Sequence, residues 1–351
     1  MPSLYDPLQL GDFRVSNRVF MAPLTRCRAS TGRVPNALMA QYYAQRASAG
    51  LILSEATSVD PIGVGYPDTP GLWSAEQVEG WKLVTRAVHA AGGVILAQLW
   101  HVGRISDPLY LNGELPVAPS AVRPEGHVSL VRPIKEFVTP RALGREEIPG
   151  IVGAYRKAAQ HAQEAGFDGV ELHGANGYLL DQFLQDKTNR RTDDYGGPVE
   201  NRARLMLEAV DAAVSVWGPG RVGLHLAPRR DAHDMGDSDP AATFGYVARE
   251  MGKRKIAFLC AREKTGPDSL GPLLKKEFGG AYVANEAFSR EEAEKIVASG
   301  TADAVAFGKL FIANPDLPRR FREKTPLNTP NADTFYQYSH PEEGYTDYQS
   351  L

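Results

Sequence analysis

Residues 149–174 read PGIVGAYRKAAQHAQEAGFDGVELHG and join an amphipathic helix to a buried strand. Pro149–Ala165 has the mixed polar and apolar pattern of a helix that packs on one face. Gly169–Gly174 is a short β-rich run that is apolar on both faces, as the strands of a covered parallel sheet are. A helix followed by such a strand is the repeating unit of an α/β protein.

The same unit recurs along the chain. We expect strands at Val19–Leu24, Leu51–Ala56, Val94–Trp100, Gly169–Gly174, Val222–Pro228, Lys255–Arg262, Ala281–Glu286 and Ala304–Lys309. The clearest further helices are expected at Ser74–Ala91, Val199–Trp217 and Ser289–Ser299. Ser74 and Ser289 stand where helix N-caps are favoured, and glycines follow both helices, at Gly92-Gly93 and at Gly300.

Eight strand–helix units in a chain of this length predict an α/β fold, a (β/α)8 TIM barrel. No Gly/Ser linker or break in composition divides the chain, so we expect one domain over residues 1–351. Leu8–Val15, with Gly11-Asp12 at its turn, is interpreted as an N-terminal hairpin that closes the bottom of the barrel. The Pro-rich stretch 101–149 is too long for a simple connection, and we expect it to cap the active-site end.

Composition excludes several classes of protein. The chain has 43% hydrophobic and 23% charged residues, the profile of a folded globular protein, and its 39 basic and 42 acidic residues leave no basic excess for nucleic acid. Cys27 and Cys260 have neither metal-ligand nor disulfide spacing, which favours a reducing compartment. With no signal-peptide pattern at the N-terminus and no apolar run that spans a membrane, a cytoplasmic protein is expected.

Candidate catalytic residues lie at the strand ends, where chemistry gathers in such barrels. His173 and Asn176 follow the fourth strand, and both can donate a hydrogen bond toward one carbonyl oxygen and stabilise negative charge on it. Tyr178 offers a phenol that can hand over a proton. The competing interpretation is a buried core histidine and a packing tyrosine. Three such groups at one strand end favour the functional interpretation.

Motifs of other enzyme classes are missing. Gly63-Val64-Gly65 runs on to Asp68 and does not open a helix, so a Rossmann-type nucleotide site is not expected. No GxxxxGK[ST] or HExxH pattern occurs. The acidic stretch Asp231–Asp239 has the composition of a hard-metal loop, although solvated acidic loops are commoner, and we expect no metal.

Seven stretches together resemble the Old Yellow Enzyme family, the NADH:flavin oxidoreductases and N-ethylmaleimide reductase-like ene-reductases. They are Met21–Arg26, Gly65–Pro67 with Thr69–Trp73, Gln98–Arg104, His173–Leu184, Asn189–Gly197, Phe311–Leu317 and Glu343–Tyr348. The resemblance covers nearly the whole chain. It implies a TIM barrel that holds non-covalent FMN at the C-terminal end of its strands.

The resemblance also implies roles for single residues. Pro23, Leu24 and Thr25 would line the isoalloxazine, with Thr25 bonded near C4=O and N5, and Ala56 and Gln98 would contact the pyrimidine edge. His173 and Asn176 would grip the carbonyl or nitro group of a substrate. Tyr178 would be the proton donor. The pocket over the flavin would be shaped by Tyr66, Trp100 and Tyr336.

The implied reaction has two halves and acts on CH–CH bonds. NADPH or NADH delivers a hydride to FMN N5, and an enal, enone, maleimide or nitroalkene then takes that hydride at its β carbon. Both ligands use the same flavin face, which agrees with the missing Rossmann motif.

Two positions depart from the family pattern. His225 stands in the fifth strand where the family usually has an arginine beside flavin N1–C2=O, and histidine carries a charge only when protonated. We expect it to become imidazolium when FMN is reduced. Lys309 replaces the usual arginine after Gly308, where the FMN phosphate is expected against Gly308 and Asn285-Glu286.

Other interpretations stay open. The same flavin chemistry can act on nitrate esters, nitroaromatics or quinones. A metal-dependent barrel hydrolase would use His173 with Asp231–Asp239, and a third possibility is a barrel that binds phosphorylated ligands without catalysis. We expect a small-molecule partner, an activated alkene or nitro compound, with neither nucleic acid nor membrane, and a monomer or homodimer.

Overall fold

The computed structural model describes residues 1–229 and 232–351. In this part of the chain the parallel strands follow one another around a closed barrel. The barrel strands are β3 (Val19–Met21), β4 (Ile52–Leu53), β6 (Ile95–Trp100), β9 (Gly169–Gly174), β10 (Val222–Leu226), β11 (Phe258–Arg262), β12 (Ala281–Asn285) and β13 (Ala304–Phe307). The pairing of Ile52 in β4 with Ile95 in β6 closes the ring, so the predicted TIM barrel is confirmed.

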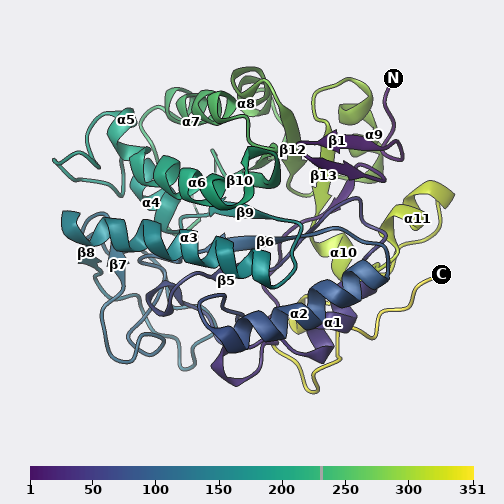
Figure 1. The fold of residues 1–351 in the computed structure, drawn as a ribbon, viewed down its shortest axis with the longest axis horizontal. Coiled ribbons are helices and arrows are strands. Elements are labelled where there is room, and N and C mark those ends of the chain that lie inside the picture. Colours follow the sequence, from purple (N-terminus) through teal and green to yellow (C-terminus); the bar gives the residue numbers. More distant parts are fainter. Residues whose placement is uncertain (230–231) are drawn as a thin grey trace.

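Helices surround the strands (Figure 1). Their bounds are α1 (Ala37–Ala44), α2 (Ala75–Ala90), α3 (Ile148–Glu164), α4 (Leu179–Leu184), α5 (Val199–Arg202), α6 (Arg204–Trp217), α7 (Pro240–Arg254), α8 (Gly271–Phe278), α9 (Arg290–Ala298), α10 (Lys309–Ala313) and α11 (Leu317–Glu323). The N-caps predicted at Ser74 and Ser289 are both capping boxes, completed by Gln77 and Glu292. The helix expected over Val199–Trp217 is divided at Ala203 into α5 and α6.

The predicted N-terminal hairpin is confirmed as β1 (Leu8–Leu10) paired with β2 (Phe13–Val15). Gly11 takes φ +58 at its turn, and a Cβ there would lie 2.3 Å from the carbonyl oxygen of Gly220, so only glycine fits. Leu10, Phe13 and Val15 pack in one buried cluster with residues of the barrel strands. The hairpin therefore closes the end of the barrel at which the strands begin.

Several strands are shorter than expected. The run Leu51–Ala56 forms a strand only at Ile52–Leu53, followed by β5 (Thr57–Ser58) against β6. Lys309, expected at the end of the last strand, begins α10 instead. In each case the polar or small residues at the carboxyl end leave the sheet and turn toward the mouth of the barrel.

The segment 101–149 holds little regular structure. It contains the parallel pair β7 (Val117–Ala118) and β8 (Arg141–Ala142), with a short 3-10 helix at Arg145–Glu147. Val102, Ile105, Val128 and Phe137 of this segment pack in one buried cluster with Tyr178. The segment therefore covers one side of the barrel end that carries the candidate catalytic residues.

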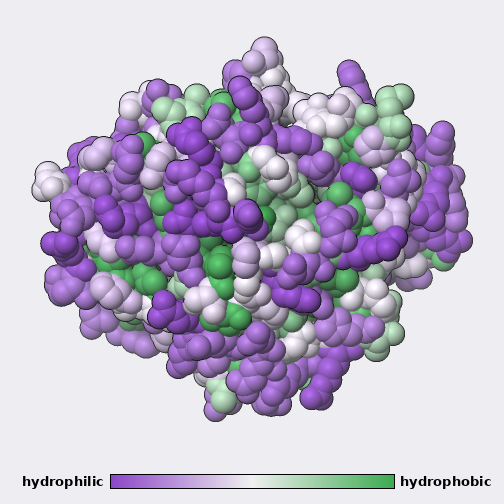
Figure 2. Space-filling view, turned by 45° about the horizontal axis from the view of Figure 1, so that its top comes forward, coloured by the Kyte–Doolittle hydropathy of each residue, from purple (hydrophilic) through white to green (hydrophobic). Residues whose placement is uncertain are grey.

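The surface seen in Figure 2 is mostly hydrophilic, with smaller apolar areas between the charged side chains. No helix within residues 1–229 and 232–351 is both long and apolar enough to cross a membrane.

Candidate active site

The carboxyl ends of the barrel strands surround a cavity of about 350 Å³, within the range of small-molecule sites. Most of the residues selected from the sequence line it. They are Pro23, Leu24, Thr25, Ala56, Gln98, His173, Asn176, Tyr178, His225, Asn285, Glu286, Gly308, Lys309 and Tyr336. The fold thus brings together residues from positions 23 to 336 at one end of the barrel, where sites of this architecture lie.

Tyr66 and Trp100 are not among the residues that line this cavity. Both contact Tyr178: the Tyr66 hydroxyl is 2.9 Å from the Tyr178 hydroxyl, and the Trp100 ring meets the Tyr178 ring edge-on at 5.1 Å. Trp100 is fully buried. The two aromatic side chains therefore hold the Tyr178 side chain in place.

The floor of the cavity contains a chain of buried polar groups. His225 is paired in register with His173 on one side and Cys260 on the other, so these side chains point toward the barrel axis together. His225 Nδ1 lies 3.4 Å from a Glu171 carboxyl oxygen, and Nε2 lies 3.9 Å from Cys260 Sγ and 3.5 Å from Asn285 Nδ2. Gln98 Nε2 donates to the same Glu171 oxygen at 2.8 Å.

Glu171, His225 and Cys260 are of metal-ligating types, and their ligand atoms lie within 4.8 Å of one another. The imidazole, however, stands between the other two, with Nδ1 toward Glu171 and Nε2 toward Cys260. Because only one ring nitrogen can face a given ion, this arrangement is better described as a hydrogen-bond chain. Cys260, which has no metal-ligand spacing in the sequence, belongs to this chain.

The turn after β9 places Asn176 and Tyr178 through an unusual backbone. Asn176 has φ +59 and Gly177 has φ +79, a region that asparagine and glycine tolerate best. A Cβ at Gly177 would lie 2.8 Å from Met235 Cγ. The Gly177 amide donates to Asp181 Oδ2 at 2.9 Å, and His233 Nδ1 lies 2.7 Å from the Asn176 carbonyl oxygen. The turn is therefore held from both sides.

Burial sets the protonation of the two central groups. The pKa of His173 is lowered well below its ordinary value, first by burial and then by electrostatic repulsion from His225 and Arg262. Burial also raises the pKa of Tyr178 well above that of a free phenol. At neutral pH the imidazole is uncharged and the phenol keeps its proton. His173 Nδ1 is buried without a hydrogen-bond partner in the protein, as a group that awaits a ligand would be.

Asp181, which anchors the turn, supplies a pH test. Burial raises the pKa of its carboxyl from 3.8 to about 7. The folded state then holds this proton up to about neutral pH while the unfolded chain releases it near pH 4, so the free energy of unfolding falls as pH rises between those values. Between about pH 5 and about pH 8 the expected loss is on the order of 3 kcal/mol. Urea unfolding across that range measures it.

The matched variant is Asp181→Asn, which cannot titrate. Its stability is expected to change less with pH than that of the wild type by that same amount, whatever its absolute stability. Equal pH slopes for the two proteins would contradict the assignment of a raised pKa to Asp181.

The corner between β12 and β13 combines a cation with strained backbone. Glu286 and Ala287 follow β12 with φ +124 and φ +55, respectively, conformations that glycine adopts at lower cost. Gly308 and Lys309 face the same cavity from the end of β13. The sequence, poor in glycine here, thus still makes the sharp turn that brings main-chain groups to the cavity.

The C-terminal segment closes one wall. Phe335 and Tyr336 line the cavity, and two buried arginines after β3 donate hydrogen bonds to carbonyl groups of this segment. Arg26 Nε donates to the Phe335 carbonyl oxygen at 3.1 Å, and one of its terminal nitrogens donates to that of Gly344 at 2.7 Å. Arg28 donates to the carbonyl oxygens of Thr334 and Glu343, each at 3.0 Å.

Sequence reasoning missed some residues of the site. Arg262 at the end of β11 lines the cavity, as do Phe288, Phe307 and Phe335. Arg262 could have been predicted from the rule that functional residues lie at the ends of barrel strands, because it is the last residue of the sixth predicted strand. The aromatic residues carried no local signal.

The acidic stretch Asp231–Asp239 is described only from residue 232, so Asp231 lies outside the described residues. Asp234 pairs with Lys187 at 2.6 Å, Asp237 with Arg202 at 3.4 Å, and Asp239 caps α7. Asp234, Asp237 and Asp239 thus already have partners within the protein.

Three comparisons place the chain among known proteins. The family model described as "NADH:flavin oxidoreductase / NADH oxidase family" matches residues 3–328. The 12-oxophytodienoate reductase 2 of Arabidopsis thaliana is 44% identical over 367 positions, covering 99% of this chain and 96% of that protein. The solved structure of the old yellow enzyme homologue from Zymomonas mobilis has a TM-score of 0.96 and 46% identity, covering 100% of both chains.

A second solved structure, morphinone reductase in complex with tetrahydroNAD, has a TM-score of 0.96 and 49% identity, covering 100% of this chain and 98% of that chain. A parallel barrel with this pocket at its C-terminal end, together with these relatives, defines a flavin-dependent NAD(P)H oxidoreductase. The chain belongs to the NADH:flavin oxidoreductase family, also called the Old Yellow Enzyme family. It is an oxidoreductase of the ene-reductase type.

Proposed function

We propose that this enzyme reduces carbon–carbon double bonds activated by a carbonyl or nitro group, as in enals, enones, maleimides and nitroalkenes. The observation that carries the proposal is the meeting of an uncharged His173, Asn176 and a protonated Tyr178 at one wall of the cavity. Hydrogen-bond donors and a proton source at one place are what such a substrate needs.

The cavity fits non-covalent FMN as the resident cofactor. Pro23 and Leu24 offer an apolar wall for a flat ring, and Lys309 offers a cation for a phosphate at the β13 corner. Gln98 Nε2 is engaged by Glu171, which leaves the carbonyl end of its amide to accept from an N–H of the ring. Bound FMN supplies hydride transfer, with NADPH or NADH as the donor.

Further residues of the cavity take the roles that the family resemblance implies. Thr25 and Ala56 would contact the ring with Pro23 and Leu24, and the main chain of Asn285, Glu286 and Gly308 would hold the phosphate. Tyr336 would border the space above the ring. The conformational strain at Glu286 supports a ligand-binding role for this corner, because such strain persists mainly at functional sites.

The chain's own contribution to the reaction is to orient the substrate and move one proton. His173 and Asn176 donate to the oxygen of the activating group, which draws electron density away from the double bond. Tyr178 Oη holds the proton destined for the α carbon, and its oxygen lies 2.9 Å from the Tyr66 hydroxyl, which holds the phenol in place. Because burial keeps the phenol protonated, the donor is ready across the neutral pH range.

The test uses the purified protein and a panel of acceptors. We expect a yellow protein whose colour is bleached by anaerobic NADPH or NADH and restored by an enone or a nitroalkene, with loss of the double bond in the product. Bleaching that only nitrate esters, nitroaromatics or quinones reverse would move the activity to those acceptors. A protein that stays colourless with added FMN, or that is coloured but not bleached, would contradict the proposal.

A further inference from the structure

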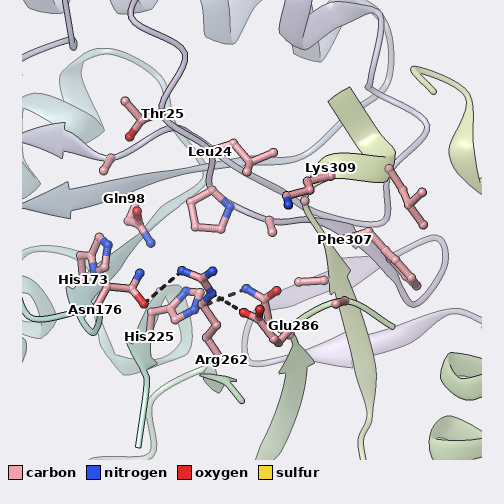
Figure 3. Close-up of a pocket in the computed structure, with 18 of the residues that line it drawn as sticks. Leu24, Thr25, Gln98, His173, Asn176, His225, Arg262, Glu286, Phe307 and Lys309 are labelled. Atoms are coloured by element: carbon pink, nitrogen blue, oxygen red, sulfur yellow. Dashed lines mark hydrogen bonds and ion pairs between the residues drawn. The ribbon is translucent and has the colours of Figure 1, made fainter. Parts of the chain in front are cut away.

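Arg262 is the charged residue of the cavity to which the proposed reaction has so far given no role. It ends β11, two residues after Cys260, so its side chain leaves the strand on the same face as Cys260, nearer the mouth of the barrel. The side chain is 33% exposed. Figure 3 shows its guanidinium between Asn176 and Glu286, with contacts to both.

In the contact between Arg262 and Asn176, the arginine is the donor and the asparagine amide is the acceptor. A terminal nitrogen of Arg262 donates to Asn176 Oδ1 at 3.3 Å, and Arg262 Nε forms an ion pair with Glu286. A guanidinium has donors only, so it selects the carbonyl end of the amide. The NH₂ end of Asn176 is thereby left to serve as a donor. Without Arg262, rotation of the amide by half a turn would place a carbonyl oxygen against the ligand.

Arg262 also sets the charge at this wall. Among the described residues that line the cavity, the permanent cations are Arg262 and Lys309, and Lys309 lies at the β13 corner. His225 is titratable and has protein groups at both ring nitrogens. Among the described residues of the lining, Arg262 is therefore the fixed cation that acts on the pair His173–Asn176, and it is ion-paired with Glu286.

We propose that Arg262 is a positioning residue for the activating group of the substrate: it holds Asn176 with Nδ2 toward the ligand, and its charge stabilises the oxyanion that forms there. This inference rests on the proposed function. When a hydride adds to the β carbon, the electron pair of the double bond moves toward the carbonyl or nitro oxygen, and a proton on the α carbon completes the reduction. The preferred substrates are therefore those whose negative charge gathers on oxygen.

The experiment separates the substrate step from the cofactor. The holoenzyme and its Arg262→Met variant are reduced with dithionite, and reoxidation is followed with 2-cyclohexen-1-one and, separately, with ferricyanide, which needs no oxyanion site. For Arg262→Met we expect enone reoxidation slowed by about 10- to 100-fold, below the cost of losing a direct donor. The ferricyanide rate and the FMN dissociation constant are expected to stay at wild-type values.

Three further variants and one additive make the test specific. Arg262→Lys keeps the charge but not the fork and is expected to recover part of the enone rate. Free guanidinium ion is expected to raise the rate of Arg262→Ala and not that of the wild type. Lys264→Met removes an exposed charge outside the cavity lining and is expected to behave as wild type.

Each contrary result has one meaning. A wild-type enone rate in Arg262→Met overturns the inference, and so does an equal fall of both reoxidation rates. Weakened FMN binding with an unchanged enone step assigns Arg262 to the cofactor instead. A wild-type enzyme that ferricyanide reoxidises and no enone does refutes the proposed function itself, which distinguishes the two failures.

Discussion

Replacement of Tyr178 by phenylalanine is expected to slow the reduction of the alkene by about 100- to 10,000-fold, the usual contribution of a general acid. Reduction of the bound flavin by NADPH or NADH needs no proton from this phenol and is expected to proceed at the wild-type rate. Phenylalanine fills the same buried space, so the loss reflects the hydroxyl rather than the packing. Anaerobic stopped-flow measurements of the two half-reactions separate the steps.

Tyr66→Phe is the matched control, because it removes the partner of the Tyr178 hydroxyl and leaves the proton donor in place. A smaller loss, of about 10-fold or less, is expected in the same half-reaction, in line with one hydrogen bond between neutral groups. Loss confined to flavin reduction in Tyr178→Phe would contradict the role of Tyr178 as proton donor.

His225→Leu is expected to lower the free energy of unfolding by about 1–3 kcal/mol, because a buried carboxyl group loses one of its hydrogen-bond partners. The Glu171 carboxyl is fully buried, and without the imidazole only the Gln98 amide bonds to it. We also expect weaker FMN retention or slower flavin reduction, since we propose that His225 carries a positive charge beside the reduced ring. Denaturant unfolding of the apoprotein and FMN titration measure the two effects.

A double variant, His225→Leu with Glu171→Gln, is the control for the stability effect. It replaces the carboxyl group that the single variant leaves with one hydrogen-bond partner fewer, so most of the lost stability is expected to return while the flavin effect remains. Unchanged FMN binding and flavin reduction in His225→Leu would exclude the proposed imidazolium.

The barrel could be predicted because each strand can be recognised from its own short stretch of sequence. Gly169–Gly174 was predicted to the residue, since an apolar run between a helix and a glycine-rich turn has clear limits. Strand β4 was overestimated, because the apolar run Leu51–Ala56 continues after the pairing with β6 has ended. Hydrophobicity reports burial, and the residues beyond a strand end are buried here as well.

The residues of the candidate site could likewise be predicted only in part. His173, Asn176 and Tyr178 are close in sequence, so their meeting could be foreseen from one strand end. The role of Arg262 could not be predicted in this way, because its contact with Asn176 joins residues that are 86 positions apart in the sequence. Tyr66 and Trp100, predicted to shape the pocket, contact Tyr178 and are not among the residues that line the cavity, a distinction that sequence order does not encode.

The grip of Arg26 and Arg28 on the carbonyl groups of residues 334–344 has a consequence for the order of events during synthesis. Arg26 leaves the ribosome well before Phe335, because the two residues are 309 positions apart in the sequence. An emerging chain can form most of the barrel with the pocket still open on one side. Stable capture of the cofactor is thus a late step, which follows translation of the segment that Arg26 and Arg28 hold.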